Sequence, residues 1–170
     1  MHDNKRIRQY VGILSALIAY YFIHEGAHLL YALGIGAFKG IHYMGVGLMI
    51  DIYRERMSDL QLGLFCLAGP LATFIASLVL ILLTKRFCSV ESKLLRAICY
   101  YTTICFLLLD PIYLSVICGF VGGGDMNGIK LLIPELAARI IFGLLFVSNL
   151  FLFVKYLLPQ YKASFAEPTN

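Results

Sequence analysis

Four long apolar blocks constrain this chain more than any other feature of its sequence. The blocks run from Tyr10 to Leu33, Leu60 to Leu83, Leu94 to Cys118 and Leu136 to Leu158. A helix rises about 1.5 Å per residue, so roughly 20 residues cross the about 30 Å of hydrocarbon in a bilayer. Only 14% of the residues are charged, against roughly 25% in soluble domains. The sequence therefore predicts an all-α integral membrane protein with four transmembrane helices.

Basic residues near the block ends predict the orientation of these helices. Nine Lys and Arg lie on the side that holds both termini, and five lie on the other side. The nine are Lys5, Arg6, Arg8, Lys85, Arg86, Lys93, Arg96, Lys155 and Lys162, and the five are Lys39, Arg54, Arg56, Lys130 and Arg139. Because such residues gather on the cytoplasmic side, we expect a multi-pass protein of a prokaryotic cell membrane with both termini in the cytoplasm.

The distribution of apolar and charged residues predicts the domain bounds and the class of partner. Residues 1–158 are expected to form one domain embedded in the lipid bilayer, and residues 159–170 a polar, disordered C-terminal tail. Basic residues that snorkel from helix ends explain the net charge of +4. Without a basic run or an aromatic-basic array, no nucleic-acid partner is expected, and the sequence sets no oligomeric state.

The first block contains the polar sequence "HEGAH", with His24, Glu25 and His28. An ionised residue at the centre of a membrane helix costs about 2.5 to 3.5 kcal/mol, so three polar neighbours need a common reason. His24 and His28 are one helical turn apart and can both reach one metal ion, while Glu25 is rotated by about 100° and suits a base that activates water. Two hydrogen-bonded histidines beside a paired glutamate are the alternative.

Zinc is the metal that these ligands favour. Histidine-rich di-iron sites would need more imidazoles than His2 and His42 can add, and both of these lie outside the apolar blocks. A catalytic zinc usually has three protein ligands. The third could be Asp110, at a depth in block three that matches His28, or Asp125, which the flexible glycines at 122–124 could turn back toward the bundle.

Two further segments could bind a peptide. Pro70 is expected to kink the second block, and Gly69 permits close approach of another helix. The kink either serves helix packing or opens space for an extended substrate. Between the first two blocks, Val46, Leu48, Ile50 and Ile52 alternate with other residues, which predicts a short β-hairpin or re-entrant strand segment. A strand edge can bind a substrate by β-augmentation, although a plain interfacial hairpin would have the same pattern.

The sequences "HEGAH", "AGPLATF" (68–74) and "GGGDMNG" (122–128) together resemble the site-2 protease family of intramembrane zinc metalloproteases. The resemblance implies that His24, His28 and Asp125 bind Zn²⁺ and that Glu25 is the catalytic general base. It also implies that Gly69, Pro70 and Thr73 contact substrate. The expected activity is hydrolysis of peptide bonds in membrane-anchored peptides or proteins. The alternative is a non-catalytic member of the same fold that binds a transmembrane partner.

Overall fold

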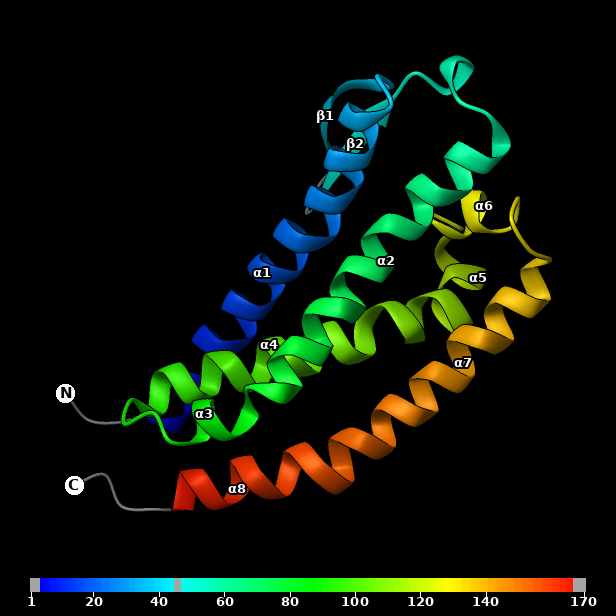
Figure 1. Cartoon of the computed structure of the whole chain (residues 1–170). Coiled ribbons are helices and arrows are strands. Elements are labelled where there is room, and N and C mark those ends of the chain that lie inside the picture. Colours follow the sequence, from blue (N-terminus) through cyan, green and yellow to red (C-terminus); the bar gives the residue numbers. More distant parts are fainter. Residues whose placement is uncertain (1–3, 45–46, 167–170) are drawn as a thin grey trace.

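The computed structural model describes residues 4–44 and 47–166, and its long helices form four spans (Figure 1). The first two spans are α1 (Lys5–Gly34) and α2 (Asp59–Leu82). The third comprises α4 (Lys93–Ile112), a π-helical turn η2 (Tyr113–Ile117) and α5 (Cys118–Val121). The fourth comprises α7 (Glu135–Leu152), a second π-helical turn η3 (Phe153–Leu157) and α8 (Leu158–Ala166). All four are long and apolar enough to cross a membrane, as predicted.

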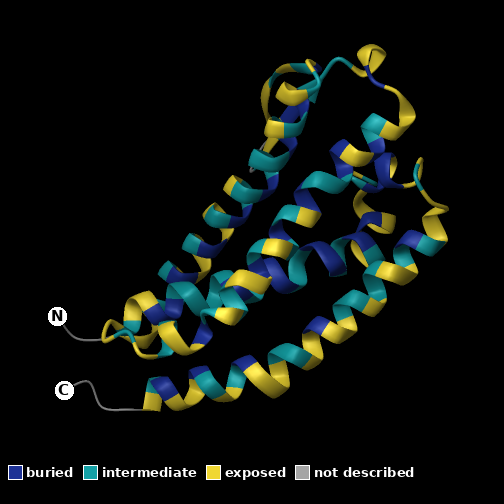
Figure 2. Ribbon diagram, viewed as in Figure 1, coloured by how far each residue is buried: buried dark blue, intermediate teal, exposed yellow. Residues whose placement is uncertain are grey.

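The outer surface of these spans is strongly apolar. At most a third of the most apolar stretch of any span is buried within the protein, and only 11% for the fourth. Large exposed side chains include Phe22, Leu82 and Phe120, and exposed positions run along the outside of the bundle (Figure 2). An apolar surface of this extent on a monomer needs a covering, and hydrocarbon would supply one.

Helix α1 packs through a stripe of residues spaced four apart. The buried members are Gly12, Ala16, Tyr20, His24, His28 and Ala32. Because a helix turns by about 100° per residue, each step of four advances the stripe by about 40° around the helix. Its N-terminal part therefore meets α4, where Gly12 lies against Ala97, and its C-terminal part meets α2, where His28 lies against Phe65. The stripe carries both histidines into the protein interior.

Proline interrupts the hydrogen bonding of α2 and α4. Pro70 in α2 and Pro111 in α4 have no N–H, so the carbonyls four residues earlier lose their helical donors. For Pro111 this carbonyl belongs to Leu107, and Asn149 Nδ2 on α7 donates to it at 2.7 Å. The π-helical turn η2 begins two residues after Pro111. Both prolines lie beside the polar cluster described below.

A β-hairpin joins α1 to α2, as predicted. Strands β1 (Phe38–Met44) and β2 (Gly47–Ile52) pair antiparallel, with Ile41 opposite Ile50 and Tyr43 opposite Leu48. Ile50 is buried, and the hairpin lies beside the C-terminal part of α1 (Figure 1). Val46 of the predicted alternation lies outside the described residues. A 3₁₀ turn, η1 (Arg54–Arg56), leads to α2, whose first turn has a Ser58 capping box.

The C-terminal segment differs from the expected disordered tail. Helix α8 continues to Ala166, with Tyr161 packed against Leu107 and Leu157 and with the Ser164 carbonyl accepting a hydrogen bond from Arg96. These contacts order a segment whose composition is polar; residues 167–170 lie outside the described part of the chain. Two short helices complete the fold, α3 (Thr84–Cys88) and α6 (Met126–Ile129).

Candidate metal centre

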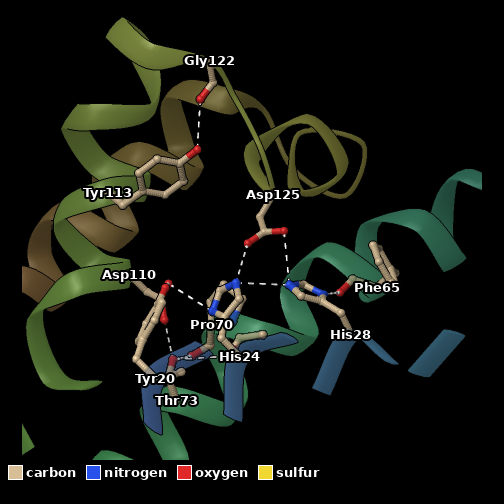
Figure 3. Close-up of polar contacts among 11 residues, drawn as sticks. Tyr20, His24, His28, Phe65, Pro70, Thr73, Asp110, Tyr113, Gly122 and Asp125 are labelled. Carbon is tan, nitrogen blue, oxygen red and sulfur yellow. Dashed lines mark hydrogen bonds and ion pairs between the residues drawn. The ribbon is translucent and has the colours of Figure 1, made fainter. Parts of the chain in front are cut away.

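Three of the predicted metal ligands converge in the interior (Figure 3). His24 Nε2 lies 3.2 Å from His28 Nε2 and 3.1 Å from Asp125 Oδ2, and His28 Nε2 lies 3.4 Å from Asp125 Oδ1. These three residues are the group of described His, Cys, Asp and Glu side chains that could hold a metal ion. Residues more than 100 positions apart in the sequence thus meet at one point.

The separations are compatible with a single bound metal ion. A tetrahedral ion bound at about 2.0 to 2.1 Å holds its ligand atoms roughly 3.4 Å apart. The two Nε2 atoms are 3.2 Å apart, and one ligand atom from each of the three residues lies within 4.8 Å of the others, with one Asp125 oxygen nearer His24 and the other nearer His28. Two imidazoles and a carboxylate form a donor set known from catalytic zinc sites, which leave a fourth position open. The Asp125 side chain is 18% exposed, against 8% for His24 and 4% for His28, so Asp125 is the most accessible member of the group.

The charge of Asp125 also suits a metal. This residue follows the third span, and burial by itself would raise the pKa of its carboxyl. The neighbouring His24 and His28 imidazoles outweigh burial and lower the pKa of this carboxyl to about 2. Asp125 is therefore ionised at neutral pH and supplies a negative charge where a divalent cation would need one.

The other nitrogen of each imidazole faces an acceptor. His28 Nδ1 lies 2.7 Å from the Phe65 carbonyl, which can only accept, so Nδ1 carries the proton and the neutral ring presents its Nε2 lone pair to the centre. His24 Nδ1 lies 3.4 Å from Asp110 Oδ1. Metal-binding histidines use a carbonyl or carboxylate in this way to fix the ring and its tautomer.

Glycines bring Asp125 back to the bundle after the third span. Gly122 has φ +107° and Gly124 has φ +35°, in the region that favours glycine. The Tyr113 hydroxyl on η2 donates to the Gly122 carbonyl at 3.0 Å and fills the space that a side chain at Gly124 would need (Figure 3). The predicted reversal of the chain at 122–124 is therefore present.

Gly69 on α2 allows the two histidines to lie where they do. A Cβ atom at this position would be 2.5 Å from His28 Nε2 and 2.7 Å from His24 Nε2. Any side chain here would displace the two nitrogens that face Asp125. The expected close approach of another helix at Gly69 is thus an approach to the imidazoles of α1.

Asp110 lies beside the ligand group. Its carboxylate accepts hydrogen bonds from the Tyr20 and Thr73 hydroxyls and faces His24 Nδ1, on the far side of the ring from Asp125 (Figure 3). Thr73 is fully buried, and its hydroxyl is within hydrogen-bond distance of Asp110 and of the Pro70 carbonyl. Its predicted contact with a substrate stays a prediction. The geometry gives Asp110 and Thr73 positions that support His24.

Glu25 lies off the buried stripe of α1, between the ligand group and the hairpin. It lies near His28, His24 and Asp125 and against the backbone of Ile50 on β2. It also lines a groove of about 950 Å³ between α1, the hairpin and Ala72 of α2. Among the described residues that line this groove, Glu25 is the charged one and the rest are mainly aliphatic or aromatic. Glu25 thus faces both the ligand group and an apolar groove.

No family model, curated protein or solved structure matches this chain. The chemistry of the site therefore has to be argued from its own geometry.

Sequence reasoning overlooked two tyrosines at this site. Tyr20 stacks on His24 with ring centroids 5.1 Å apart and hydrogen-bonds Asp110. Its position four residues before His24, on the same helical face, was a usable signal. Tyr113, which holds the loop before Asp125, had no comparable signal because its partner is a backbone carbonyl nine residues later.

Proposed function

We propose that this protein is an integral membrane zinc metallopeptidase that hydrolyses peptide bonds of membrane-anchored peptides or proteins. The observation that carries the proposal is the convergence of His24 Nε2, His28 Nε2 and the Asp125 carboxylate, with Glu25 on the next position of the same helix. A zinc ion in such a site lowers the pKa of bound water toward 7 and polarises a carbonyl.

The residues of the chain then take separate roles. His24, His28 and Asp125 would hold the ion, and Glu25 would take a proton from water and return it to the leaving amine. Asp110 and the Phe65 carbonyl would hold the imidazole rings in place. Gly69, together with the kink at Pro70, keeps α2 from filling the space beside the histidines.

The groove beside Glu25 supports an apolar peptide as the substrate. Its walls are the lipid-facing side of α1 and hairpin residues Ile41, Tyr43 and Leu48. A peptide must be extended to expose its scissile carbonyl, and a strand edge of the hairpin offers backbone hydrogen bonds to an extended chain. A membrane-anchored substrate would reach this groove sideways from the bilayer.

Replacing Glu25 with Gln tests the peptidase. The amide keeps the size of the side chain but cannot accept a proton at neutral pH, so cleavage should fall by roughly 10²- to 10⁴-fold. Bound zinc should stay at one per chain, because Glu25 is not among the three ligands. The measurement presents membrane-anchored fusion peptides to the protein in liposomes, with zinc determined on the same samples.

Glu55→Gln is the matched control, because it makes the same chemical change at an exposed position outside the groove. It should cleave like wild type. Undiminished cleavage by a zinc-loaded Glu25→Gln variant would contradict the role of Glu25. Full zinc loading without cleavage by wild type, across a broad peptide panel, would favour the non-catalytic protein that binds a transmembrane partner.

A further inference from the structure

A second cavity lies at the end of the bundle that holds both termini, away from the candidate metal centre. It has a volume of about 590 Å³ and lies between the first turns of α1, the α4 segment around Ala97, and α8. The start of α1 and the last turn of α8 lie near this end of the molecule (Figure 1). The metal ligands come from the opposite half of α1 and from the loop after α5.

The walls of this cavity combine positive charge with aromatic rings. Lys5 and Arg8 come from α1 and Lys162 from α8, and among the described residues no acidic side chain lines the cavity. Tyr100, Tyr101 and Phe165 contribute rings to its walls. Cations from the two ends of the chain therefore converge on one concave, partly apolar site.

A buried arginine adds to the positive charge. Arg96 is 4% exposed, precedes the lining residue Ala97, and has its guanidinium carbon 5.7 Å from the Phe165 ring. Its hydrogen bonds go to the Ser164 and Glu91 carbonyls, its Nε has no partner, and no described carboxylate forms an ion pair with it. Arg96 does not itself line the cavity, but its guanidinium lies near the lining residue Phe165 and adds to the positive charge at this end of the bundle.

We propose that the cavity binds the phosphate group of an anionic phospholipid from the leaflet around the chain termini. Lys5, Arg8 and Lys162 would contact the phosphate, and the rings and aliphatic residues such as Leu158 would contact the glycerol and the start of the acyl chains. Basic cavities between transmembrane helices are known to recognise lipid headgroups. The proposal rests on the proposed membrane location and is independent of zinc and of peptidase activity.

The test measures retained lipid by native mass spectrometry of the full chain in detergent, titrated with phosphatidylglycerol. The variant is Lys5→Gln with Lys162→Gln, and the control is Lys85→Gln with Arg86→Gln, which removes the same charge from exposed α3 positions at the same end of the molecule. The cavity variant should bind phosphatidylglycerol roughly 30-fold more weakly. This is the affinity change expected when two lysines each contribute about 1 kcal/mol of binding free energy to an anionic lipid. The control should bind like wild type.

Equal weakening in both variants would overturn the proposal, because it would indicate general attraction of lipid to a basic surface. Binding of phosphatidylcholine as strong as that of phosphatidylglycerol would also overturn it. Inorganic phosphate and soluble glycerol phosphate are added as competitors, and displacement of the lipid at micromolar concentration would identify a soluble phosphate as the ligand instead. Zinc content, measured in parallel, should be equal in all variants, which separates this result from the test of the peptidase.

Discussion

Asp110 is a single carboxylate shared by three neighbours from two other helices. The Tyr20 hydroxyl and His24 Nδ1 reach it from α1, and the Thr73 hydroxyl reaches it from α2. It is 3% exposed, so these contacts provide hydrogen-bond partners for its buried oxygens. Asp125 lies on the other side of the His24 ring and contacts both histidines. The two aspartates that the sequence offered as alternative ligands therefore occupy different positions relative to the same imidazole.

This arrangement predicts different zinc behaviour for two matched substitutions. Asp125→Asn should bring bound zinc well below one per chain, because it weakens a ligand. Asp110→Asn should lower zinc affinity by about 10- to 100-fold but still allow loading at saturating zinc, as expected for a group that positions a ligand. The measurement is a competition titration with a zinc chelator on purified protein.

Asp59→Asn serves as the control, since Asp59 is exposed at the start of α2. Thermal unfolding of the zinc-free proteins measures the stability of each variant. A variant with wild-type stability and weaker zinc binding has changed its zinc affinity. Normal zinc in Asp125→Asn together with loss of zinc in Asp110→Asn would exchange the roles of the two aspartates.

At the scale of the elements, the hydrogen bond that Pro111 removes from α4 is replaced by a donor on α7. Pro111 removes the donor for the Leu107 carbonyl, and Asn149 on α7 replaces it at 2.7 Å. Both Leu107 and Asn149 are buried. A buried carbonyl that loses its helical donor needs another partner, and the bond from Asn149 supplies it and joins α7 to α4 beside Pro111.

Asn149→Leu should therefore lower the free energy of unfolding by about 1 kcal/mol, the scale of interhelical hydrogen bonds in membranes. The reason is that the Leu107 carbonyl stays buried without a donor. The measurement is unfolding in mixed micelles with increasing sodium dodecyl sulfate. Ser148→Leu, at the exposed neighbouring position on α7, should leave stability nearly unchanged. Equal stability of the two variants would show that the Asn149 bond contributes nothing.

For the whole molecule, four spans place both termini at one end and the hairpin at the other (Figure 1). His24 lies 19 residues after Lys5, about 29 Å along α1, so the candidate metal centre is closer to the hairpin end. If the termini are cytoplasmic, as the distribution of Lys and Arg predicts, the hairpin and the site lie toward the outer surface. The proposed lipid cavity would then face the cytoplasmic leaflet.

Labelling single introduced cysteines with a membrane-impermeant maleimide tests this orientation in intact cells. Cysteine at Glu55, beside the hairpin, should be labelled from outside, and cysteine at Glu91, between α3 and α4, only after lysis. Both positions are exposed and avoid the helix caps at Ser58 and Ser92. Wild type gives the background from its own five cysteines. Labelling of the Glu91 position alone from outside would reverse the orientation.

The sequence by itself determined the four spans, the hairpin and the pairing of His24 with His28. These follow from local rules, because apolar length defines a span, alternation defines a strand, and a spacing of four puts two side chains on one helical face. The stripe that buries both histidines runs along α1 at that same spacing.

Only the tertiary structure decided which aspartate meets the histidines and what surrounds them. Depth and spacing left Asp110 and Asp125 open, and it was the resemblance to a known family that favoured Asp125. Their positions depend on the glycine turn after α5, the Tyr113 hydroxyl and the close approach of α2 at Gly69. The same holds for α8, whose polar composition predicts disorder but whose Tyr161 packs against Leu107 and Leu157. Such contacts join segments far apart in the chain, and the free energy of packing them together is not encoded in the local pattern of either segment.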